Sequence, residues 1–199
     1  ICGLTTKNYN RIFLTLARTL RRQGMSPEDL SKHLGEQSGE SGEWPSDQRF
    51  IESWHAQHAY QLLNNPKILH ILSRLNDTYA NSKMESIQIE GALTVEHILP
   101  QVWVENWPLQ DGTKGMTLHE IYVAEASSPR VIASKARNRM LQTFGNLTIL
   151  TKPLNSALSN AAWEVKKPEI IRNSLLPINQ QLNDIAVWDE AAISARSMD

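Results

Sequence analysis

Four polar side chains stand at spacings that suit hydrolysis of a phosphodiester. Glu96 and His97 follow a β-prone stretch, Asn146 opens a second one, and Asn155 comes nine residues later. A carboxylate and an amide oxygen are hard ligands that suit Mg²⁺ or Mn²⁺, so we expect Glu96 and Asn155 to hold one metal ion. An imidazole that titrates near neutrality can take a proton from an attacking water, which makes His97 the predicted general base.

The same residues also have ordinary structural interpretations. Asn146 could orient the imidazole of His97 through its side chain or its carbonyl, or it could serve only as a turn residue after Gly145. Asn155 could cap a helix as well as bind a metal. Neighbouring residues of a strand point to opposite faces, so Glu96 and His97 can serve one site only where the strand ends or curves.

The elements that must position these residues are two short strands and a helix. The pattern predicts a strand over about 87–97, a second strand over 146–151, and a helix from Asn155 to Lys166 with another over 169–176. The connection over about 102–143 is long enough to carry structure of its own, and helices are expected over 118–126 and 130–141. Trp103 and Trp107 in it are expected to anchor the loop in the core.

Apolar residues at helical spacing predict a helical scaffold upstream of the strands. The expected helices span about 8–23, a short segment from Ser26, 48–63 and 67–79, and a last helix spans 178–195. We therefore expect a helical segment over 1–85, a core over 86–176 that contains the two strands and an insertion at about 102–143, and a C-terminal helix over 177–199 that packs on the scaffold.

Composition limits the class of protein. The chain has 199 residues and a formal net charge of −1, and its single cysteine excludes an internal disulfide. It has no apolar run long enough to cross a membrane. Because it begins at Ile1 without an export leader, we expect a fragment of a longer cytoplasmic protein.

Basic residues are concentrated in two segments, which makes a nucleic-acid partner possible in spite of the neutral total. Residues 1–24 hold five basic and no acidic side chains, and residues 130–172 hold eight basic against two acidic. We expect nucleic-acid contacts from Gln101, Lys152, Lys166 and Lys167. The Lys166-Lys167 pair could instead be a solvated helix end.

Two sequence runs resemble a known nuclease family. Val95-Glu96-His97-Ile98-Leu99-Pro100-Gln101 resembles the Asp/Glu-His-Ile-x-Pro-Gln signature of HNH (His-Me finger) nucleases. The run Phe-Gly-Asn-Leu-Thr-Ile-Leu from Phe144, followed by Asn-Ser-Ala-Leu-Ser-Asn and Lys-Lys, resembles the C-terminal HNH domain of GmrSD-type, modification-dependent restriction endonucleases. The resemblance covers roughly Trp44 to Trp188.

The resemblance implies a mostly α, α+β fold, in which a helical scaffold surrounds a small ββα-metal core. It implies a metal-dependent DNA endonuclease that acts as the effector module of a bacterial restriction or anti-phage protein. Its catalytic residues would be His97 and Asn146, and Glu96 and Asn155 would bind one divalent ion, Mg²⁺ or Mn²⁺ rather than Zn²⁺. The expected partners are DNA, including modified DNA, and an N-terminal nucleotide-hydrolysing sensor domain of the same protein. Glu96 departs from the Asp common in other HNH enzymes, and Asn155 from their His.

The alternative hypothesis is a non-catalytic DNA-binding or interaction module that keeps the HNH fold. The sequence specifies neither the DNA modification recognised nor nicking against double-strand cleavage, and RNA remains an alternative substrate.

Overall fold

A computed structural model describes residues 1–5, 7–37, 39, 42–81 and 88–198. The chain divides into two compact units, Ile1–Ala56 and Gln57–Asp199. The boundary expected at residue 85 lies outside the described residues. The described helices after residue 56 belong to the same compact unit as the strands.

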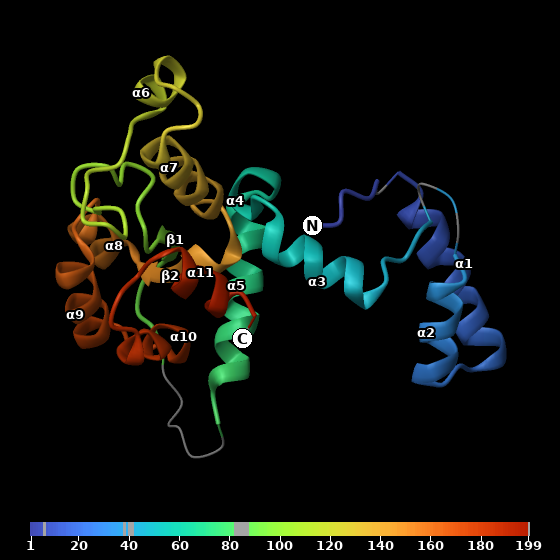
Figure 1. Ribbon diagram of the computed structural model, residues 1–199. Helices are drawn as coiled ribbons and strands as arrows, with labels where there is room; N and C mark the ends of the chain where they lie inside the picture. Colours follow the sequence, from blue (N-terminus) through green and yellow to red (C-terminus); the bar gives the residue numbers. More distant parts are fainter. Residues whose placement is uncertain (6, 38, 40–41, 82–87, 199) are drawn as a thin grey trace. The chain divides into compact units, whose positions relative to one another are not determined.

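The first unit is made of three helices in its described part (Figure 1): α1 (Tyr9–Gln23), α2 (Pro27–Gly35) and α3 (Asp47–Ala56). Helix α1 ends where Gly24 takes a positive φ of 66°, which a glycine adopts at little cost. Helix α2 begins with a capping box, in which the hydroxyl of Ser26 accepts from the amide of Asp29 and the Asp29 carboxylate accepts from the amide of Ser26.

The second unit is organised around a two-stranded antiparallel sheet. Strands β1 (Leu93–His97) and β2 (Leu147–Thr151) pair so that His97 faces Leu147 and Leu93 faces Thr151. The expected first strand was longer. Its start at residue 87 lies outside the described residues, and 88–92 are not part of the strand. Two helices precede the strands in this unit, α4 (Ala59–Leu62) and α5 (Asn65–Tyr79).

Helices from both ends of this unit pack on the sheet. Helix α5, which precedes the strands, and helix α8, which follows β2, both contact β1 and β2 (Figure 1). The elements after the sheet are α8 (Lys152–Leu158), α9 (Trp163–Asn173), α10 (Pro177–Gln180), the 3₁₀ segment η2 (Gln181–Asp184) and α11 (Glu190–Arg196). The helix expected over 155–166 is therefore two helices separated by a tight turn. The single helix expected over 178–195 is three short pieces, of which α10 packs on α5.

The insertion between the strands carries α6 (Leu118–Val123), α7 (Pro129–Met140) and the 3₁₀ turn η1 (Phe144–Asn146). Trp103 and Trp107 are buried, as expected for loop anchors. The indole of Trp103 donates to Asn138 and that of Trp107 to the carbonyl of Ala161, so the long loop is fastened both to α7 and to the turn after α8. The fold is mostly α with one small sheet, which confirms the expected class.

The core of this unit joins the insertion to the C-terminal pieces. Its largest members are four tryptophans. Three of them pack in a row, Trp107 on Trp163 and Trp163 on Trp188. The buried cluster consists of Ile98, Leu99, Trp103, Trp107, Leu109, Leu141, Leu150, Leu158, Trp163, Ile170, Leu182, Trp188 and Ile193. Because these residues come from the insertion before β2 and from the segments after it, the insertion and the C-terminal segments stabilise one another.

Candidate active site

The end of β1 brings a carboxylate and an imidazole to one hollow. Glu96 and His97 are both largely buried, at 8% and 7% exposure. Both line a hollow of about 180 Å³, together with Pro100, Gln101, Ser159 and Asn160. The strand ends at His97, so the alternation that would separate neighbouring side chains no longer applies beyond it. The sequence analysis required the strand to end or curve at Glu96 and His97 if both were to serve one site, and the strand does end there.

The imidazole of His97 is held by two groups that the sequence did not indicate. Its Nε2 lies 3.1 Å from the amide oxygen of Gln142, and the ring of Tyr60 packs edge-on, with centroids 4.5 Å apart. An amide oxygen can only accept, so Nε2 carries the proton and the lone pair of the neutral ring is on Nδ1. Burial lowers the pKa of His97, Gln142 opposes the shift, and the Lys166 ammonium adds to it. The lowered pKa favours the neutral form of the ring, which is the form that can act as a base.

Lys166 binds both residues of this pair. Its ammonium, with the side chain fully buried, donates to Glu96 Oε1 at 2.5 Å and to the carbonyl of His97 at 2.9 Å. Burial raises the pKa of Glu96, and the adjacent ammonium opposes that rise. Burial likewise lowers the pKa of Lys166, against the pull of Glu96. The lysine thus fixes one carboxylate oxygen and leaves Oε2 as the oxygen available to a ligand.

Asn155 lies within α8 and is tied to β1. Thr151, not Asn155, is the N-cap residue of this helix, so the capping alternative does not apply. The Asn155 Nδ2 donates to Thr94 Oγ1 at 2.9 Å and to the carbonyl of Val95 at 3.1 Å. The Thr94 hydroxyl donates its own hydrogen bond to the carbonyl of Leu150, so toward Asn155 it can only accept. The amide nitrogen of Asn155 must therefore face the strand, and the oxygen is the atom directed away from it.

Asn146 holds the chain that follows His97, and its side chain does not contact the imidazole. It is fully buried, accepts from the amide of Leu99 at 2.8 Å, and donates to the carbonyls of Leu99 and Leu141. The indole of Trp188 donates to the same side-chain oxygen. The Asn146 carbonyl accepts from the amide of Ile98. Asn146 thus shapes the turn into which His97 leads, whereas Gln142 makes the bond to the imidazole that had been expected of Asn146.

The four residues expected to contact nucleic acid differ in accessibility. Gln101 is exposed and lines the hollow, and Lys152 is exposed at the start of α8. Lys167 is half-buried and donates to the carbonyl of Ile185. Lys166 is not at the surface, whereas a contact with phosphate requires an accessible ammonium. Its place beside Glu96 replaces the solvated or phosphate-binding role considered from the sequence.

The donor set fits a hard divalent cation. In the described part of the chain no group of three His, Cys, Asp or Glu side chains could hold a metal, so soft or imidazole-rich coordination has no basis there. Glu96 Oε2 and the oxygen of Asn155 are the carboxylate and amide oxygens that Mg²⁺ or Mn²⁺ prefers, and such ions keep several waters. By chemical type, these two oxygens are ligands that the ion expected from the sequence prefers.

The sequence gave no direct signal for Gln142 or Tyr60 as partners of His97. They lie 45 residues after it and 37 before it, and neither belongs to a recognisable motif. The Lys166 contact joins residues 70 apart in the chain. Of the three partners, Gln142, Tyr60 and Lys166, only Lys166 was indicated by the sequence, because the Lys166-Lys167 pair belongs to the resemblance to the nuclease family.

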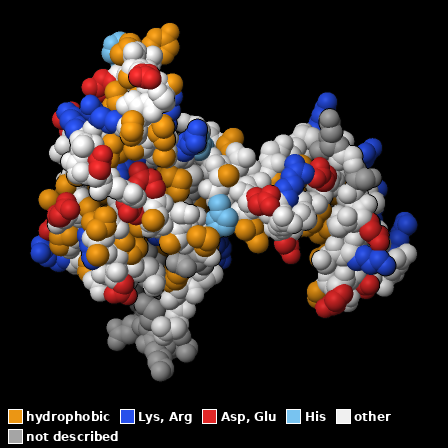
Figure 2. Space-filling model, viewed as in Figure 1, with side chains coloured by type: hydrophobic (Ala, Val, Ile, Leu, Met, Phe, Trp, Pro, Cys, Tyr) orange, Lys and Arg blue, Asp and Glu red, His pale blue; other side chains and the backbone are white. Residues whose placement is uncertain are grey.

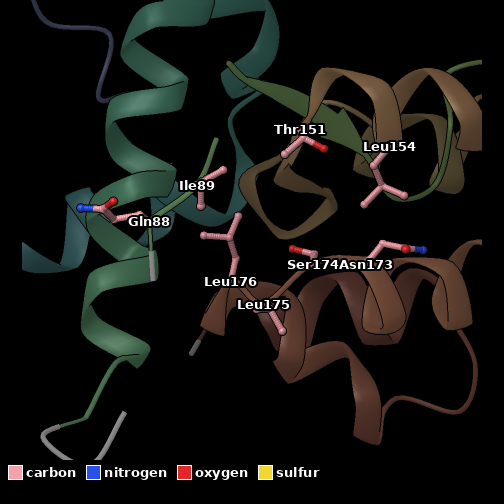
Figure 3. A pocket seen from close by; sticks show the side chains of 8 residues that line it. All are labelled: Gln88, Ile89, Thr151, Leu154, Asn173, Ser174, Leu175 and Leu176. Atoms are coloured by element: carbon pink, nitrogen blue, oxygen red, sulfur yellow. The ribbon is translucent and has the colours of Figure 1, made fainter. Parts of the chain in front are cut away.

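A second hollow lies away from this pair, between the end of β2 and the segment after α9 (Figure 3). Its volume is about 140 Å³, and none of its lining residues carries an ionisable side chain. They are Gln88, Ile89, Thr151, Leu154, Asn173, Ser174, Leu175 and Leu176. Without an acid, a base or a charge, this hollow offers no hydrolytic chemistry. The hollow at Glu96 and His97 has both a carboxylate and an imidazole, and it is the candidate active site.

Two antiparallel strands and the helix that follows them form a ββα unit, and its polar residues meet at the end of the first strand. A family profile described as GmrSD restriction endonucleases, C-terminal domain, matches residues 44–199. The chain belongs to this family of restriction endonucleases. Neither a curated protein nor a solved structure matches it. No helix in the described ranges is long and apolar enough to span a membrane.

Proposed function

We propose that this chain is a metal-dependent DNA endonuclease of the HNH type and the effector module of a bacterial restriction protein. The observation that carries the proposal is the joint position of Glu96 and His97 at the end of β1, where both line one hollow. Asn155 supports it, because α8 attaches this residue to the same strand. The family supplies the class of substrate.

In the proposed reaction, water attacks the phosphorus atom of a DNA phosphodiester, and the bond from phosphorus to the leaving oxygen breaks. Nδ1 of His97 takes the proton of the attacking water, while Nε2 keeps its own proton on Gln142. Tyr60 and Gln142 hold the ring in one orientation. Glu96 and Asn155 would hold a Mg²⁺ or Mn²⁺ ion, which would supply Lewis-acid stabilisation of the developing negative charge.

The proposed partners are DNA and a sensor domain. The face in Figure 2 shows basic and acidic side chains interspersed over the unit that carries the sheet. Part of the positive charge read from the sequence is neutralised internally, because Arg137 is paired with Glu190 and Lys166 with Glu96. Affinity for DNA therefore rests on local contacts at the hollow and on an N-terminal nucleotide-hydrolysing domain of the same protein.

The test is nicking of plasmid DNA in Mg²⁺ or Mn²⁺ by the wild-type chain and by His97→Ala. Loss of a general base reduces the rate by about 10²–10⁴-fold. His97→Asn, which keeps a polar group for Gln142, serves as a second variant, and the exposed His119→Ala is the matched control. Cleavage that survives in both His97 variants would refute the assignment. Binding of DNA without cleavage in any divalent metal would favour the non-catalytic module, and preferential cutting of RNA would change the substrate.

A further inference from the structure

The turn between α8 and α9 contains a residue in a conformation that suits glycine. Ser159 has φ 40° and ψ −126°, and it is the one non-glycine residue with positive φ in the described part of the chain. The amide of Ala161 donates to the carbonyl of Leu158 at 2.9 Å, which closes a four-residue turn with Ser159 at its first central position. A turn of this kind, type II′, normally has glycine there. A side chain in such a conformation costs about 1–3 kcal/mol.

Contacts from the long insertion hold the turn in place. Asn106 donates to the carbonyl of Asn160 at 2.9 Å, and the Trp107 indole donates to that of Ala161 at 3.0 Å. The amide of Ser159 donates to the carbonyl of Asn155 at 3.2 Å. The backbone of the turn is therefore determined by the loop over it and the helix before it. None of these bonds involves the serine side chain, so glycine would make the same turn without strain.

The Ser159 side chain has no described partner within the fold. It is exposed, and among the described residues no hydrogen bond engages its hydroxyl. With Asn160 it lines the hollow that holds Glu96 and His97. Strained residues that packing does not require are concentrated at functional sites. Ser159 lies beside the predicted base. This position indicates that serine stands here because of its hydroxyl, since the turn itself would accept glycine.

The charges around the hollow indicate the ligand of that hydroxyl. Of the six lining residues, Glu96 is acidic and none is Lys or Arg. The lysine beside Glu96 is fully buried and already bonded. A phosphate that enters the hollow must therefore be held on this side by neutral donors. The accessible ones are the Ser159 hydroxyl and the side-chain amides of Asn160 and Gln101.

We infer that the Ser159–Asn160 turn is a phosphate-binding element of the active site, in which the Ser159 hydroxyl donates to a backbone phosphate oxygen of the bound DNA. The inference rests on the proposed function, since it places a phosphodiester in this hollow. The strain at Ser159 is then maintained because it directs a donor toward the substrate. Such a contact is made to the backbone, so it is independent of base sequence.

The test uses Ser159→Gly, which removes the hydroxyl and the strain together. We expect its Tm to rise by about 2 °C, while kcat/KM for DNA cleavage falls about tenfold, the contribution of a hydrogen bond to a charged oxygen. Ser159→Ala should lose the same activity without the gain in Tm. Ser156→Ala, exposed on α8 outside the hollow, is the matched control. A Ser159→Gly variant with wild-type kcat/KM would overturn the inference.

A binding measurement separates this inference from the proposed function. In a His97→Ala background, the affinity for a fluorescein-labelled DNA duplex is measured by anisotropy with Ser or Gly at position 159. We expect the glycine to weaken binding several-fold, equally for unrelated duplex sequences. If the wild-type chain fails to cut DNA, the proposed function fails while this comparison still decides the role of Ser159. Equal affinities, or no binding by either protein, would overturn the phosphate contact.

Discussion

Replacing Lys166 by methionine should destabilise the second unit strongly. Methionine keeps most of the apolar stem but removes the ammonium that serves Glu96 and His97. Glu96, at 8% exposure, would then be a buried carboxylate without its cation. Breaking a buried ion pair by removing one partner costs about 3–5 kcal/mol. We expect a loss of that size in the free energy of unfolding at pH 7 in the presence of EDTA.

The assay should report the unit that carries the sheet alone. Native-state hydrogen exchange of the amides in β1 and β2 meets this need, because the slowest amides follow the global opening of their unit. Lys152→Met, at an exposed site on α8, is the control and should change stability by less than about 0.5 kcal/mol.

A double-mutant cycle separates the ion pair from general damage to packing. If Glu96 without its cation is the cause, the double variant Glu96→Gln/Lys166→Met should be more stable than Lys166→Met alone. A loss below about 1 kcal/mol in Lys166→Met, or no recovery in the double variant, would refute the reasoning that the lysine offsets the burial of Glu96.

Three further outcomes follow from the same structure. Burial lowers the pKa of His97 in the folded protein. Its contribution to stability is therefore complete above the unfolded pKa of about 6.5, declines below that value, and is lost as pH falls through the lower folded pKa. Wild-type Tm should decline relative to that of His97→Asn as pH is lowered from 7.5 to 5.5, and parallel curves would contradict this. Gly145→Ala should lower the free energy of unfolding, measured by urea denaturation, by at least about 2 kcal/mol, because the added Cβ would lie 2.1 Å from the main-chain oxygen of Ile193. An unchanged denaturation midpoint would show that α11 can shift to accommodate the methyl group at little cost. Mn²⁺ at a hundred times its Kd should stabilise the wild-type chain by about 2.7 kcal/mol, which is detected as a rise in Tm. The rise should be much smaller for Glu96→Gln and for Asn155→Ala. Equal rises in all three proteins would place the ion elsewhere.

The sequence predicted the ββα order and the pair at the end of the first strand because both depend on local pattern. The strand pairing of Val95 with Ile149 follows from two apolar runs at the right separation. The break between α8 and α9 was not predictable in this way. Residues 158–162 contain neither glycine nor proline, so helical periodicity appeared to continue through them. Bonds from Asn106 and Trp107, more than 50 residues earlier, impose the turn.

Lys166 and Gln142 show a second limit of sequence-based prediction. A lysine pair after a helix is most often solvated, and nothing local indicates that one of its members is buried against a carboxylate 70 residues away. The imidazole partner was likewise sought at Asn146, the polar residue nearest the second strand, whereas the bond comes from Gln142 just before η1. Position in a motif identified the chemical groups, but the three-dimensional packing decided which group contacts which.

The C-terminal helix has a consequence for when the site can form during synthesis. Arg196 on α11 donates to the carbonyls of Gly145 and Leu147, and the Trp188 indole donates to Asn146. The turn that shapes the end of β1 therefore takes part of its support from residues that follow it in the chain by 42 to 51 positions. A nascent chain that already contains Glu96, His97 and Asn155 still lacks that support. In the cell, such ordering delays completion of the candidate site until α11 has been synthesised.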